Sequence, residues 1–285
     1  MTVVNFNGLD LLPTYDESQS VIGPGFYFTT LTDWYTIPDS KSAIRERAQL
    51  DGAFNIDRDW RQSAAISVVG VYVGSSDTDA TQAKRTLRQA IGSGATATMT
   101  VTDPLGPTSR QVSIRVVKIA DDKGGHAFTF SIDSVAMDPY RYGPPVSASA
   151  GLATAGTGYP WPAVWPADWG SGGSDGRASV TNSGDAETWP ILQVRGGIAS
   201  GVELVEIATG SDLRLDRQIP QDSVAIFNSR TGRVYLDSAA NDITGFLTRR
   251  EWWSVPPGAT RTVQLNPLGP TTGVPSLTVT IAPAY

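Results

Sequence analysis

His126 is the one side chain in this sequence suited to general base chemistry near neutral pH, because the chain has a single histidine and no cysteine. A histidine catalytic group or a multi-histidine metal site needs partners that the chain lacks. The missing cysteines also exclude disulfides, thiolate metal sites and cysteine nucleophiles. His126 follows Gly125 in a predicted turn. We therefore interpret it as a solvated surface residue.

Two acidic pairs, Asp121-Asp122 and Asp77 with Asp79, offer the oxygen ligands that Ca²⁺ prefers. Neither pair has the loop spacing of a calcium site, and both lie where aspartate commonly stabilises a turn or a helix start. No carboxylate pair is singled out for sugar hydrolysis. The glycine-rich stretch 92–94 closes a helix instead of opening one, and 170–176 lacks the lysine of a phosphate loop. We expect no catalytic site, no metal and no cofactor.

Aromatic residues are the remaining candidates, since six of the eight tryptophans lie in the second half. Exposed aromatics can stack on sugar rings, whereas buried ones close cores or line subunit contacts. We predict that Trp189 and Trp253 belong to a core. A further group of aromatics is predicted to form a subunit interface or crossover segment: Trp161, Trp165, Trp169, Tyr140 and Tyr142.

Composition limits the class of protein that holds these residues. The chain has 285 residues, 40% apolar and 18% charged, which is enough for two domains with real cores. Its net charge is −6 and no block of lysine and arginine stands out, so a duplex-binding surface is not expected. The N-terminus lacks the features of a signal peptide, and no apolar run approaches the roughly 20 residues of a membrane helix. We expect a soluble protein made in the cytoplasm, without membrane insertion.

Short strands joined by turns dominate the periodicity of the chain. In the first half, alternating apolar residues predict strands over 66–73, 95–102, 112–119 and 127–135. Gly70 inside the first of these suggests a bulge or a close neighbour. One helix is predicted over 79–91, capped by Ser76 or Asp77.

In the second half we predict strands, but no helix. The candidates are 191–194, 202–207, 213–216, 224–227, 233–237, 262–265 and 277–281. Short strands at regular spacing describe a β-sandwich or jelly roll. The prolines of 138–145 and the small residues after them end the first sheet. We therefore divide the chain into a domain over 1–145, a Pro/Gly/Trp-rich linker and crossover over 146–170, and a second domain over 171–285.

With both halves considered, the sequence resembles the distal tail proteins, or minor tail proteins, of phages with long non-contractile tails (siphoviruses) that infect Gram-positive bacteria. The resemblance covers nearly the whole chain and rests on the order and spacing of five segments: 60–70, 138–142, 159–166, 219–237 and 252–258. Gln221-Asp222 depart from the glycine that the family often has before a hairpin of the second domain.

The resemblance implies a mainly β fold with two domains. The first would be a β-sandwich or barrel like that of tail-tube subunits, with one flanking helix, and the second a galectin-like or jelly-roll sandwich. It implies a structural hub of the tail tip or baseplate, in the virion, made in the host cytoplasm. A hexameric ring of this protein would join the tail tube to the tip and leave a channel for DNA. The implied partners are further copies of the chain, the tail tube protein, the tail tip (hub) protein and the tape measure protein.

Physical arguments add two expectations to the resemblance. A channel that passes DNA should not bind it, which suits an acidic chain without a basic cluster. A polar, uncharged strand face carried by Thr96, Thr98, Thr100 and Thr102 is a candidate wall of that channel. We also expect the first domain to satisfy its open sheet edges by pairing with neighbouring copies. The alternative function is a carbohydrate-binding module, in which aromatics of the second domain hold host cell-wall saccharide.

Overall fold

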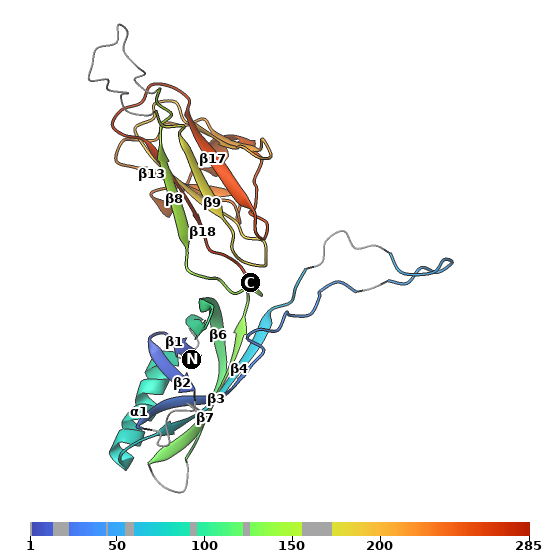
Figure 1. Cartoon of the computed structure of the whole chain (residues 1–285), viewed down its shortest axis with the longest axis vertical. Coiled ribbons are helices and arrows are strands. Elements are labelled where there is room, and N and C mark those ends of the chain that lie inside the picture. The colour runs from blue at the N-terminus through green and yellow to red at the C-terminus, as the bar shows by residue number, and fades with distance from the viewer. Residues whose placement is uncertain are drawn as a thin grey trace, which may run out of the picture. The chain divides into compact units, whose positions relative to one another are not determined.

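A computed structural model describes residues 2–13, 23–43, 45–54, 60–91, 96–121, 126–155 and 173–285 of the chain. Strands dominate both halves, so the fold is mainly β, as predicted (Figure 1). The chain divides into two units, Met1–Tyr142 and Gly143–Tyr285. Each unit has its own hydrophobic core.

The first unit is a closed β-barrel. Its strands are β1 Val3–Phe6, β2 Leu9–Pro13, β3 Gly25–Thr32, β4 Ala64–Val73, β5 Thr96–Asp103, β6 Gly106–Asp121 and β7 Ala127–Ala136, in the spatial order β1-β2-β3-β4-β7-β6-β5. Strand β1 pairs with both β2 and β5, which closes the ring of strands. The expectation that this domain needs neighbouring copies to satisfy its sheet edges is therefore wrong. Within the described residues, the parallel β2–β3 seam holds the pairs Leu12↔Tyr27 and Pro13↔Phe28.

Helix α1 spans Asp77–Ile91, two residues longer at its start than predicted. Ser76 caps it, because its hydroxyl accepts a hydrogen bond from the Asp79 amide at 3.2 Å. The Asp79 carboxylate in turn accepts from the Ser75 amide at 3.0 Å, and this bond lowers the pKa of Asp79. The buried side of the helix is its short apolar stripe of Ala80, Ala83, Leu87 and Ile91. Alanines in this stripe let the helix lie close to the barrel strands.

Gly70 marks the tightest point of the barrel wall. A Cβ atom at this position would lie within 2.9 Å of Cε1 of Phe130, and closer still to the Tyr27 carbonyl oxygen. Directly opposite, β3 carries a bulge between Phe28 and Thr30. Both alternatives suggested by the sequence, a bulge and a close neighbour, occur here.

The second unit is a two-sheet β-sandwich. One sheet has the order β15-β14-β13-β10-β18-β8 and the other β16-β12-β11-β17-β9. The strands are β8 Val146–Gly151, β9 Arg177–Thr181, β10 Ile191–Arg195, β11 Val202–Glu206, β12 Asp212–Leu215, β13 Val224–Asn228, β14 Arg233–Leu236, β15 Ser238–Asp242, β16 Leu247–Arg250, β17 Thr260–Pro267 and β18 Ser276–Ile281. Their inward residues, among them Leu192 and Phe227, form one core together with Trp253 of the segment between β16 and β17.

The start of the predicted linker is a strand. Residues 146–151 form β8, which pairs along its length with β18. Its small residues show almost no alternation of apolar and polar side chains. Its extended structure therefore depends on pairing with β18. Two hydroxyl contacts of 2.8 Å, Ser147 with Thr280 and Ser149 with Thr278, link the exposed side of this pair.

Glu206 holds the turn after β11. This carboxylate is fully buried and accepts hydrogen bonds from the Ala208 amide (3.0 Å), the Thr209 amide (2.8 Å) and the Thr209 hydroxyl (2.6 Å). Arg261 lies 3.5 Å away. Burial alone would raise the pKa of Glu206, but these hydrogen bonds and the nearby guanidinium outweigh burial and lower it.

Gly70→Ala tests the close approach in the barrel. We expect a loss of about 1–3 kcal/mol or more in unfolding free energy, because backbone and ring must both move. The matched control is Gly25→Ala in β3, where an added Cβ finds only ordinary contacts at 3.6 Å. Chemical denaturation measures both variants, and equal midpoints would contradict the account.

Glu206→Gln tests the buried turn carboxylate. A folded-state pKa below the ordinary 4.5 contributes stability that is present above pH 4.5 and is lost as the pH falls through the lowered value. We expect the variant to be less stable by about 1–3 kcal/mol at pH 7, with the gap to wild type closing on acidification. The exposed Asp222→Asn is the control. A gap that stays constant from pH 7 to pH 3 in thermal unfolding would refute this assignment.

Candidate functional site

Between β3 and β4 the chain runs out from the barrel as a long two-branched extension, here called the arm and comprising residues 33–43, 45–54 and 60–63 (Figure 1). Backbone hydrogen bonds join its branches. They run from Lys41 N to Trp60 O (2.7 Å), Gln62 N to Asp39 O (2.8 Å), Arg47 N to Gly52 O (3.0 Å) and Phe54 N to Arg45 O (2.9 Å). Beyond its root the two branches thus hold each other in place through their backbones.

Large apolar side chains of the arm face solvent. Their exposed fractions are Tyr35 52%, Ile37 72%, Leu50 71%, Phe54 62% and Trp60 58%. Single exposed apolar residues are ordinary, but five on one extension make the arm the candidate contact surface of this unit. The sequence analysis did not single out this apolar surface. The available signal was a connection of about 30 residues, far longer than an ordinary loop.

The arm is anchored at its root by Trp34, which is fully buried. The guanidinium of Arg110 on β6 lies 5.2 Å from the centre of the Trp34 ring and donates a hydrogen bond of 2.7 Å to the Pro139 carbonyl. Arg110 is only 4% exposed. Burial lowers its pKa to about 10, helped by the charge of Arg141 and opposed by Asp138. At neutral pH it remains a buried cation.

Tyr35, the next residue, makes a second set of contacts at the root. Its hydroxyl donates to Oδ2 of Asp103 at 3.0 Å, and the Arg141 guanidinium lies 4.9 Å from the centre of its ring. Burial, and then the bond to the Asp103 carboxylate, raise the pKa of Tyr35.

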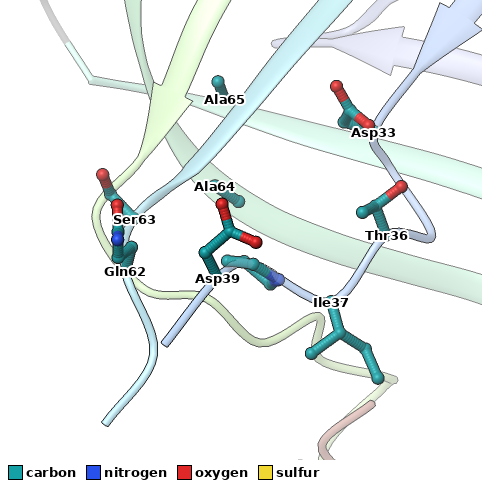
Figure 2. A pocket seen from close by; sticks show the side chains of 9 residues that line it. Asp33, Thr36, Ile37, Asp39, Gln62, Ser63, Ala64 and Ala65 are labelled. Carbon is teal, nitrogen blue, oxygen red and sulfur yellow. The ribbon is translucent and has the colours of Figure 1, made fainter. Parts of the chain in front are cut away.

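A small polar pocket of about 300 Å³ lies where the arm leaves the barrel (Figure 2). It is lined by Asp33, Thr36, Ile37, Pro38, Asp39, Gln62, Ser63, Ala64 and Ala65. Figure 2 shows Asp39 on one branch beside Gln62 on the other. The Ile37 side chain points away from these two polar side chains. Asp33 and Asp39 are its only acids, and within the described chain no cluster of three acidic or histidine residues suits a metal ion.

A second, larger groove of about 480 Å³ brings together residues that were predicted separately. It is lined by Thr96, Ser109, Arg110, Gln111, Ser113, Met137, Asp138, Tyr140 and Tyr142. Thr96 was predicted on a channel wall, and Tyr140 and Tyr142 at a subunit interface. Tyr142 is fixed here by paired backbone hydrogen bonds with Ser109 (2.8 and 2.9 Å). Its hydroxyl donates to Asp138 at 2.8 Å.

The four threonines of β5 lie on the face of the barrel wall that points away from the core. Ala97, Met99 and Val101 alternate with them and are buried, whereas Thr96 and Thr102 are exposed and Thr98 and Thr100 half-buried. Thr98 accepts a hydrogen bond from Gln111 at 2.8 Å. This face is polar and uncharged, as the sequence indicated, and its role as a channel wall remains a prediction.

Of the predicted aromatic site, Trp161, Trp165 and Trp169 lie outside the described residues. Trp253 is buried in the core of the second unit, as expected. Trp189 is half-buried, and the Arg230 guanidinium lies 5.7 Å from its ring centre.

The other chemical candidates have structural roles. His126 is largely exposed and lies 2.8 Å from the Asp77 carboxylate at the start of α1. Asp79, the partner of Asp77 in the suspected calcium pair, belongs to the helix cap. No helix in the described part of the chain has the length and apolarity to cross a membrane.

Comparison with known proteins gives matches in structure alone. No family model and no curated protein matches this sequence. The crystal structure of SPP1 Dit, described as a paradigm of the hub adsorption apparatus of phages that infect Gram-positive bacteria, aligns with a TM-score of 0.64 and 14% identity, over 100% of this chain and 99% of that one. Chains of the phage P2 baseplate, in its activated conformation with Ca and with Sr, align with TM-scores of 0.53 and 0.52 at 11% identity, each covering 98% of both chains. The chain thus has the two-unit fold of a phage tail hub protein along its whole length.

The exposed apolar residues of the arm should contribute little to the stability of the barrel. We expect Leu50→Ser with Phe54→Ser to change the unfolding free energy of the dilute protein by less than about 0.5 kcal/mol. Trp34→Ala, at the buried root, should cost about 3–5 kcal/mol. Urea unfolding measures both, and a large loss from the arm-tip variant would show that these residues pack on their own barrel.

Proposed function

We propose that this protein is a structural, non-enzymatic hub subunit of a phage tail tip, which assembles with further copies into a hexameric ring and works in the virion. Its ring would connect the tail tube to the tip or baseplate. The full-length likeness to the SPP1 Dit hub and to phage P2 baseplate chains supports the hub role.

The observation that carries the proposal is the apolar arm. Five large apolar side chains on a segment without a core of its own are costly to leave in water. A neighbouring subunit that covers them would gain roughly 25 cal/mol for each Å² of apolar surface buried. Because the barrel closes within the chain, the arm is a better candidate for the contact between subunits than strand edges.

The groove lined by Met137, Tyr140 and Tyr142 is a second candidate contact surface on the same unit. Aromatic side chains and methionine are enriched at the centres of protein interfaces. The tail tube protein, the tail tip protein and the tape measure protein are the further partners of such a hub. Its channel would pass DNA without binding it, in keeping with a net charge of −6 and the neutral threonine face of β5.

Saccharide binding by the second unit is the weaker alternative. Trp253 is buried, and Trp189 carries a guanidinium near its ring. A sugar platform needs an open aromatic face. Glycan arrays with the full chain and its Trp189→Ala variant would detect saturable binding if it exists.

Assembly can be tested at the arm tip. We expect native mass spectrometry of the wild-type chain at micromolar concentration to show hexamers, and the Leu50→Ser/Phe54→Ser variant to remain monomeric while folded. Arg85→Gln, an exposed change on α1, is the matched control and should assemble normally. Hexamers of unchanged abundance in the arm variant would remove the arm from the interface. A wild-type chain that is monomeric at every concentration would contradict the ring.

A further inference from the structure

Two segments of the first unit that are far apart in sequence meet through a pair of arginines. One is the arm root, residues 33–35. The other is the exit segment, residues 137–142, which follows β7 and leads to the second unit. The arm root starts the arm, and the exit segment starts the connection to the second unit.

The first link is Arg110, which contacts both segments from β6. Its guanidinium lies against the Trp34 ring of the arm root and donates to the Pro139 carbonyl of the exit segment. Its buried Nε and Nη1 have no hydrogen-bond partner within the described structure, so the Pro139 carbonyl is the acceptor that it depends on. If the exit segment left, the buried cation would lose that acceptor, which is strongly unfavourable.

In the second link, a side chain of the exit segment reaches the arm root. Arg141 of the exit segment places its guanidinium over the ring of Tyr35, a residue of the arm root. Tyr35 is in turn held by its hydrogen bond to Asp103 at the end of β5. Cation–aromatic contacts of this kind are attractive, and more so where water is excluded.

The exit segment is held by hydrogen bonds within itself and to β6. Asp138 accepts hydrogen bonds from the Tyr140 amide (3.2 Å) and the Tyr142 hydroxyl (2.8 Å). Tyr142 pairs with Ser109, whose neighbour is Arg110. These bonds tie the exit segment to itself and to β6 beside Arg110.

We propose that Arg110 and Arg141 are positioning residues that couple the arm to the exit segment, so that fixing or releasing one fixes or releases the other. A partner that seats the arm would then also stiffen the start of the second unit at Gly143. Coupling of this kind is reciprocal, because both segments bias the same contacts. It goes beyond the hub role and holds whether or not the chain forms a ring.

Electron paramagnetic resonance distance measurements can test the coupling, because a chain without cysteine accepts spin labels at chosen sites alone. One pair, Ala43→Cys with Gln89→Cys, reports the arm relative to α1, and both positions are exposed. A second pair, Pro144→Cys with Gln89→Cys, reports the residue just beyond the exit segment. The labelled protein is diluted into unlabelled protein, so that only pairs within one chain are read.

The decisive comparison changes a residue of one segment and measures the distance distribution of the other segment. Tyr35→Ala, in the arm root, should widen the 144–89 distance distribution about twofold or more, and Arg141→Gln should widen the 43–89 distribution similarly. Tyr35 is half exposed and Arg141 is not buried, so both variants should fold. Arg115→Gln, exposed on β6, is the control and should leave both distributions unchanged.

Arg110→Lys supplies the independent check, since it keeps the charge but loses the flat guanidinium, and should widen both distributions. If each variant widens only the distribution of its own segment, the two segments are independent and the proposal is wrong. Circular dichroism of every variant separates this result from unfolding. Because the readout is within one chain, it is decided separately from ring formation.

Discussion

The main constraint on this protein is a set of large apolar side chains on the arm that its own chain leaves exposed to water. Water penalises exposed apolar area wherever it lies, and folded chains usually place it in a core. The arm instead projects Ile37, Leu50 and Phe54 into solvent, although its root is anchored by the fully buried Trp34. A segment that is held firmly at its base and left apolar at its tip is the part of the chain that contact with another molecule would stabilise most. Assembly is the simplest way to satisfy that constraint.

The two units deal with unpaired sheet edges in different ways. The barrel removes most free edges by closing through β1, and places its helix against the core. The sandwich keeps edge strands such as β8 and covers them with small polar residues, among them Ser147 and Ser149. Neither solution needs a metal or a disulfide, and the chain has no cysteine to form one. Stability comes from two separate apolar cores and from buried hydrogen-bonded groups such as Glu206.

Periodicity predicted the elements whose side chains differ clearly between their two faces. The ends of strand β4 and helix α1 were predicted to within two residues. Gly70 indicated a close neighbour, which is Phe130. Strand β8 was missed because serine, alanine and glycine give no alternation of apolar and polar residues. Periodicity could not choose between a sandwich and a closed barrel, because closure depends on β1 pairing with β5, such as Val3 with Thr102, about a hundred residues away. The sequence did not predict the groove: its tyrosines stood out by type, but Arg110 lay outside every predicted element.

Hydrogen exchange of the arm, followed as protein concentration rises, tests the central claim most directly. At low concentration the amides of Lys41 and Gln62, which bond only across the two branches, should exchange rapidly. On assembly the same amides should become protected while those of the barrel core stay unchanged. An arm that exchanges equally fast at every concentration, in a protein that nevertheless forms rings, would contradict the account.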